Sequence, residues 1–83
     1  MQSLKGRTAL VTGSGRNIGK SIALMYASEG ANVIINNKSN IEELNTTAKE
    51  IKDLGVEVLA IQADISNEQE VNSMIGSGLE KFG

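Results

Sequence analysis

The chain has 83 residues, enough for one domain at most, and carries a formal net charge of −2. Hydrophobic residues make up 40% of it and charged residues 22%, which is typical of a folded globular segment rather than a disordered one. The sequence contains no cysteine and no histidine, which excludes disulfides, thiolate chemistry and a Ser-His-Asp site within these residues, and the negative charge argues against nucleic-acid binding.

The first predicted element is a strand at Thr8–Val11, a short continuous apolar run of the kind found in strands buried on both faces. A helix that ends at Gly30 is expected next, because apolar residues then recur with helical spacing. The stripe expected to face the core consists of Ile18, Ile22, Met25 and Tyr26. A second buried strand is predicted at Asn32–Asn36.

A second helix is predicted between a capping pair, Ser39 and Glu42, and a stop at Gly55. Its apolar stripe consists of Ile41, Leu44, Ala48, Ile51 and Leu54. The third strand is predicted at Val56–Ile61, and the third helix begins with Ser66 and Gln69 as its capping pair. The stripe of that helix consists of Val71, Met74, Ile75, Leu79 and Phe82. We expect this helix to fray, because Gly76 and Gly78 inside it each cost about 1 kcal/mol relative to alanine.

The alternation β-α-β-α-β-α predicts an α/β fold: one half of a doubly wound parallel sheet of the Rossmann type, incomplete after the third helix. Residues 1–83 are therefore expected to be the N-terminal cofactor-binding part of a single domain, a fragment with one open edge on its first strand. No apolar run approaches the roughly 20 residues of a membrane span, so we expect a cytoplasmic protein with no membrane partner.

The stretch VTGSGRNIGK, residues 11–20, places a glycine loop between the first strand and the first helix, an arrangement that suits an anion. The dinucleotide pattern GxGxxG fails by one residue, because Ile18 stands where its last glycine belongs. The phosphate loop GxxxxGK[ST] also fails by one, because five residues separate Gly13 from Gly19. The alternative without function is that these glycines only form a tight turn.

A third spacing fits better: residues 12–19, TGSGRNIG, resemble TGxxxGxG, the cofactor loop of the short-chain dehydrogenase/reductase family. The sequences NNKSN after the second strand and QADIS after the third match this family in register, so the resemblance covers the whole chain. It implies a cofactor site made of Gly13, Ser14, Gly15, Arg16, Asn17, Ile18, Gly19, Lys38, Ser39, Asp64 and Ile65. Asn17 replaces the middle glycine of the family, and we expect it to adopt a left-handed or glycine-like backbone there.

The segment after the second strand bears on the choice of cofactor. An acidic residue there favours NAD, whereas a cation accommodates the 2′-phosphate of NADP. The chain has Lys38 and no carboxylate until Glu42, and Arg16 of the glycine loop could converge with Lys38 on that phosphate. We therefore expect NADP(H), the alternative being that both cations are solvated surface charges. Asp64 is expected to accept from the adenine amino group, its alternative role being a local cap or turn.

The resemblance implies an oxidoreductase that transfers hydride between NADPH and a carbonyl substrate, such as a 3-oxoacyl thioester, a sugar or a ketone, in a parent expected to be a homo-oligomer. The family's catalytic serine, tyrosine and lysine fall beyond these residues. Tyr26 lies on an apolar stripe, so we assign it to the core and assign no catalytic and no metal-binding residue to the chain. Two alternatives stay open: a non-catalytic dinucleotide-binding module, and a nucleotide hydrolase that uses Gly19, Lys20 and Ser21.

Overall fold

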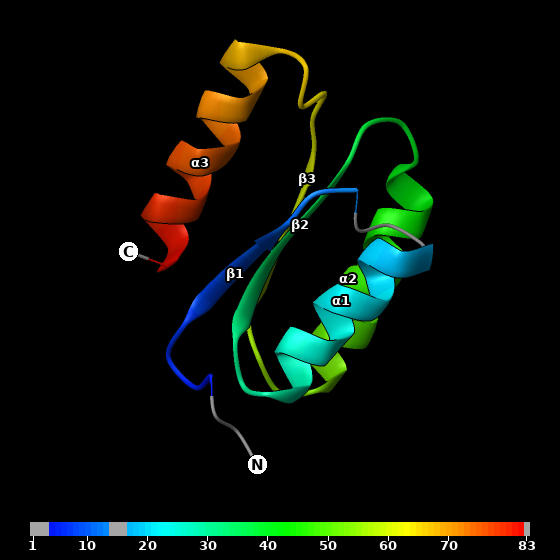
Figure 1. The fold of residues 1–83 in the computed structure, drawn as a ribbon, viewed down its shortest axis with the longest axis vertical. Coiled ribbons are helices and arrows are strands. Elements are labelled where there is room, and N and C mark those ends of the chain that lie inside the picture. Colours follow the sequence, from blue (N-terminus) through cyan, green and yellow to red (C-terminus); the bar gives the residue numbers. More distant parts are fainter. Residues whose placement is uncertain (1–3, 14–16, 83) are drawn as a thin grey trace.

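The structure is a computed structural model that describes residues 4–13 and 17–82. Three strands and three helices alternate along the described chain (Figure 1). They are β1 (Thr8–Val11), α1 (Asn17–Ser28), β2 (Asn32–Asn37), α2 (Ile41–Asp53), β3 (Val58–Gln62) and α3 (Glu68–Phe82). The predicted order and type of every element are confirmed. The strand β1 has the predicted bounds, β2 runs one residue further than predicted, and β3 starts and ends later than predicted.

The three strands form one parallel sheet in the order β1-β2-β3, so that β2 lies in the middle. Leu10 is in register with Ile34, and Ile34 is in register with Leu59. Figure 1 shows α1 and α2 on one face of this sheet and α3 on the other. Since all strands run the same way, the loops that follow them meet at one edge, which we call the carboxyl edge.

The core between the sheet and α1 is built with small residues on the helix side. Ala23 and Ala27 are fully buried and lie in one cluster with Val33 and Ile35 of the central strand. The predicted core stripe of α1 is therefore wrong in part: Ile18, Ile22 and Met25 are 78%, 37% and 55% exposed, and only Tyr26 packs against the core. Small side chains let a helix approach a sheet closely, and that contact decided which face of α1 was buried.

The helix ends follow local backbone chemistry, although both predicted N-caps are wrong by one residue. Asn40, not Ser39, caps α2 by accepting a hydrogen bond from the Glu43 N–H at 3.1 Å. Asn67, not Ser66, does the same for α3 by accepting from the Glu70 N–H at 3.2 Å. Asparagine is as good a cap as serine, so the neighbouring residue could take the position in each case. The predicted stop at Gly30 is confirmed by its left-handed φ of +92°.

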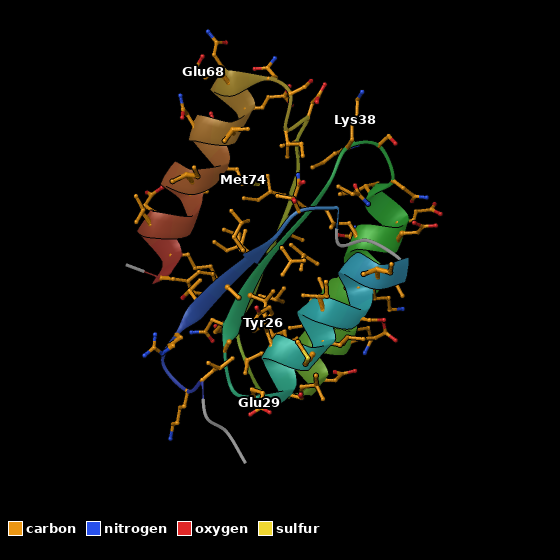
Figure 2. The ribbon with its side chains drawn as sticks, viewed as in Figure 1. Tyr26, Glu29, Lys38, Glu68 and Met74 are labelled. Atoms are coloured by element: carbon orange, nitrogen blue, oxygen red, sulfur yellow. The ribbon has the colours of Figure 1, made fainter. Side chains whose placement is uncertain are left out.

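The helix α3 continues through both of its glycines as far as Phe82. Gly78 is buried, and a Cβ built there would lie 2.5 Å from Cδ1 of Ile34 in the central strand. Close packing of α3 on β2 thus explains why residue 78 is a glycine. It does not explain Gly76, because a Cβ built there would meet nothing within 4 Å. In Figure 2, Met74 points from α3 toward the sheet, and only 2% of it is exposed.

An apolar groove of about 370 Å³ runs between α3 and β1. It is lined by Leu10 and Ile34 of the sheet and by Ile75, Leu79 and Phe82 of the helix. Within residues 4–13 and 17–82, β1 pairs with β2 alone, so its other edge is open as predicted. Leu10 and Leu79, which line the groove, are 46% and 63% exposed.

Candidate functional site

The first component of the carboxyl edge is the turn that follows β1. Gly13 has a φ of +65°, and a Cβ built on it would meet nothing within 4 Å. The chain leaves the strand through this glycine in a conformation that L-residues rarely adopt, and α1 begins at Asn17. Gly13 therefore serves the turn, as predicted. The predicted site residues Ser14, Gly15 and Arg16, and the side chain of Asn17, lie outside the part of the chain that the structure describes.

The N-terminus of α1 differs in charge from those of the other two helices. The first turn of α1 carries no acidic residue, whereas α2 has Glu42 and Glu43 there and α3 has Glu68 and Glu70. Carboxylates in the first turn neutralise the positive end of a helix dipole. The positive end of α1 lacks that internal partner, and it can therefore receive the anion of a ligand. The left-handed backbone expected at Asn17 is not found, because Asn17 is already the first residue of this right-handed helix.

A buried amide connects the second and third loops of the carboxyl edge. Asn36, the next-to-last residue of β2, is only 2% exposed. Its Nδ2 donates to the carbonyl oxygen of Ala63 at 3.0 Å and to that of Ile61 at 3.2 Å. A polar group is stable in such a place only when it is hydrogen-bonded, and here the bonds fix the end of β3 against β2.

The loop after β2 is anchored from both sides. Asn37 donates from Nδ2 to the carbonyl oxygen of Asn40 at 2.6 Å and accepts from the Asn40 N–H at 3.3 Å. Gln62, the last residue of β3, donates from Nε2 to the carbonyl oxygen of Lys38 at 3.3 Å. The backbone of Lys38 is thus held by its own loop and by the neighbouring strand. These roles of Asn36, Asn37 and Gln62 were not predicted from the sequence, where the available signal was three amide side chains at the ends of adjacent strands.

Lys38 and Asp64 come together at this edge. The Lys38 Nζ lies 3.7 Å from Asp64 Oδ2, and the side chains are 73% and 31% exposed. Figure 2 shows Lys38 in the turn after β2, at the same end of the molecule as the start of α3. The other oxygen of Asp64, Oδ1, accepts from the Ser66 hydroxyl at 2.7 Å and from the Ser66 N–H at 2.9 Å. Both the expected cation and the expected acceptor are therefore present, and each has the other as a partner.

Hydrogen bonds from the Ser66 side chain and backbone hold the pKa of the Asp64 carboxyl below its ordinary value of 3.8, and the ammonium of Lys38 lowers it further. Asp64 is therefore ionised at neutral pH. Its backbone N–H donates to Glu70 Oε1 at 3.2 Å, so the carboxylate of Glu70 also lies in this loop. The turn-forming role that was the alternative for Asp64 is observed, and it uses Oδ1, while Oδ2 pairs with Lys38.

The remaining described candidates of the cofactor site lie around the same edge. Ile18 and Gly19 are in the first turn of α1, the former strongly exposed and the latter half-buried. Ser39 follows Lys38 and is exposed, and Ile65 follows Asp64 and is 56% exposed. A left-handed glycine turn, a helix end without acidic residues, a cation and a carboxylate acceptor at one sheet edge fit the parts of a dinucleotide's adenosine half.

Two other residues singled out in the sequence have structural contacts. Tyr26 is half-buried and packs against the core, which confirms its assignment. Lys20 Nζ lies 2.7 Å from Glu50 Oε2 of α2, so a phosphate-loop role would require this lysine to leave an ion pair between helices.

None of the described helices combines the length and the hydrophobicity needed to cross a membrane. Residues 4–13 and 17–82 also contain no group of three or more acidic, histidine or cysteine side chains that could hold a metal ion.

Three parallel strands that alternate with three helices, with helices on both faces of the sheet, define an incomplete Rossmann-type α/β fold. The family model described as "short chain dehydrogenase" matches residues 7–83. The chain belongs to the short-chain dehydrogenase family, whose members are oxidoreductases that bind a nicotinamide dinucleotide.

Relatives and solved structures agree with this assignment. The chain is 44% identical over 77 residues to a 3-oxoacyl-[acyl-carrier-protein] reductase of Staphylococcus aureus, covering 93% of this chain and 31% of the relative. It is 39% identical over 80 residues to a probable tetrahydroxynaphthalene reductase of Zymoseptoria tritici, covering 96% and 30%. An NAD⁺-bound xylitol dehydrogenase matches with a TM-score of 0.92 and 32% identity, covering 98% and 31% of the two chains. The chain thus spans slightly less than a third of each relative.

Proposed function

We propose that the chain is the NADP(H)-binding part of a cytoplasmic short-chain reductase, in which hydride passes between NADPH and a carbonyl substrate such as a 3-oxoacyl thioester, a sugar or a ketone. The observation that carries the cofactor proposal is Lys38 at the carboxyl edge, where an NAD-binding protein would place an acid. The similarity to a 3-oxoacyl-[acyl-carrier-protein] reductase supports the substrate class. The nicotinamide supplies the hydride when the cofactor is bound.

We assign the predicted site residues to three parts of the cofactor. Gly13 and the backbone N–H groups at the start of α1 hold the pyrophosphate, with Ser14, Gly15, Asn17, Ile18 and Gly19 lining the same loop. Lys38, Ser39 and Arg16 hold the 2′-phosphate. Asp64 and Ile65 contact the adenine. The proposal assigns no catalytic residue to the chain, and it gives the parent protein a homo-oligomeric state.

Titration of the chain with NADPH and with NADH, by isothermal calorimetry, tests this proposal. NADPH should bind more tightly than NADH, because a charge-assisted contact with the 2′-phosphate stabilises the complex by about 1.5–3 kcal/mol. Lys38→Asp should abolish this preference, and Lys49→Asp on the exposed face of α2 should leave it unchanged. Gly13→Val should weaken both complexes, because valine at a φ of +65° is strained. Equal affinities in the unmodified chain would refute the NADP assignment.

A further inference from the structure

The ion pair at the carboxyl edge joins two groups that the proposed function assigns to different parts of one ligand. Lys38 is assigned to the 2′-phosphate and Asp64 to the adenine, and without ligand they lie 3.7 Å apart. Only one oxygen of Asp64 is open to exchange, because Oδ1 already accepts two hydrogen bonds from Ser66. The ammonium of Lys38 therefore faces the single oxygen, Oδ2, that an adenine amino group could reach.

The backbones of both partners are held by hydrogen bonds from neighbouring residues. The carbonyl oxygen of Lys38 accepts from Gln62, and the Lys38 loop is closed by the reciprocal bonds of Asn37 and Asn40. Asp64 is held by Ser66 and by the bond of its own N–H to Glu70. Only the side chain of Lys38, 73% exposed, is free to change its partner.

We propose that Asp64 is a specificity-determining residue that acts through Lys38, holding the lysine in the free protein and exchanging it for the 2′-phosphate when an NADP-type nucleotide binds. The inference rests on the proposed function. A nucleotide with a 2′-phosphate gives Lys38 a new anionic partner and releases Oδ2 for the adenine. A nucleotide without it must either break the pair uncompensated or leave the adenine without Oδ2. The phosphorylated nucleotide must therefore compete with Asp64 for Lys38, and the Asp64 charge also opposes the phosphate. Both effects limit the preference for the 2′-phosphate.

The two effects predict the same direction of change for Asp64→Asn. Asparagine keeps one oxygen, which can accept from Ser66 or from adenine but not from both in this geometry, and it neither holds Lys38 nor repels a phosphate. Two nucleotides with the same adenine lose the same contact, so that loss cancels in the ratio of their affinities. An exposed ion pair of this kind changes an equilibrium by about two- to five-fold. Since both the release of Lys38 and the loss of repulsion favour the phosphorylated ligand, the preference for the 2′-phosphate should rise by that factor.

The test uses two probes that differ only in the 2′-phosphate, adenosine 2′,5′-bisphosphate and adenosine 5′-monophosphate, titrated into the 83-residue chain. The ratio of their dissociation constants is measured for the unmodified chain, Asp64→Asn, Lys38→Met and the double variant. We expect Asp64→Asn to raise the preference two- to five-fold when Lys38 is present and to have a clearly smaller effect in the Lys38→Met chain. The matched control is Asp53→Asn, which removes the same charge from the exposed pair Lys49–Asp53 and should leave the ratio unchanged.

The outcomes separate this inference from the proposed function. A preference that depends on Lys38 but not on Asp64 overturns the inference alone. A preference unaffected by Lys38→Met, or no binding of either probe, overturns the NADP assignment and the inference with it. A readout without nucleotide is the titration of the Asp64 carboxyl carbon by NMR: Lys38→Met should raise the pKa of Asp64, and an unchanged value would show that the pair does not form in solution.

Discussion

Two glycines in α3 should respond differently to substitution by alanine. Gly76 and Gly78 lie in the middle of the helix, where alanine is favoured over glycine by about 1 kcal/mol. A Cβ at Gly76 meets nothing within 4 Å, so Gly76→Ala should stabilise the chain by close to that full amount. A Cβ at Gly78 would lie 2.5 Å from Ile34 Cδ1, and Ile34 is only 7% exposed. Overpacking of this kind costs about 1–3 kcal/mol, so Gly78→Ala should be neutral or destabilising by up to about 2 kcal/mol.

The assay is urea unfolding followed by far-UV circular dichroism, with thermal unfolding in parallel. For a domain of this size, 1 kcal/mol corresponds to a change in Tm of about 4–8 °C. Ile34→Val removes the methyl group that Gly78→Ala would strike, and alone it costs about 0.5–1.5 kcal/mol. In the Gly78→Ala background the same change should cost less or even stabilise, because it relieves the contact. Equal stabilisation by both alanines, with no coupling to Ile34→Val, would refute the close packing of α3 on β2.

Three further perturbations test the core and the carboxyl edge. Asn36→Leu should lower the free energy of unfolding by about 2 kcal/mol or more, because the carbonyl groups of Ile61 and Ala63 lose their donor. Urea unfolding measures this change, and a loss below about 0.5 kcal/mol would contradict the role of these hydrogen bonds. Ala27→Leu should lower the free energy of unfolding by about 1–3 kcal/mol, whereas Met25→Ala on the exposed face should change it by no more than about 0.5 kcal/mol. A larger effect of Met25→Ala than of Ala27→Leu would show that the stripe predicted from the sequence faces the core after all. The folded-state pKa of Asp64 is depressed, so its contribution to stability is present above the ordinary value of 3.8 and is lost as the pH falls through the lower folded value. Asp64→Asn should therefore flatten the acid limb of stability below pH 3.8, and an unchanged limb would show that Ser66 and Lys38 do not hold the carboxylate.

The order of elements could be read from the sequence because its signals are local. An apolar run at Thr8–Val11, helical spacing after it, and glycines at positions 30 and 55 specify strands, helices and their ends within a few residues of the chain. The glycine loop and the residues after the second and third strands were also local patterns, and they sufficed to predict the family, which the comparisons confirm. The shifted caps show the limit of this reasoning: an asparagine next to a serine competes for the same position, and the sequence alone cannot rank them.

The tertiary structure decided which side chains meet. Periodicity identifies an apolar face of α1. The face that packs against the sheet is instead the one with Ala23 and Ala27, because small side chains let the helix lie close to the sheet. From the sequence, Gly78 was expected only to weaken α3. In the structure, a Cβ at this position would lie 2.5 Å from Cδ1 of Ile34 in β2, a residue far away in sequence. The buried amide of Asn36 and the pair Lys38–Asp64 likewise join residues from different loops. Local propensity is a property of neighbours along the chain, whereas burial and pairing depend on neighbours in space, and those exist only once the strands have come together.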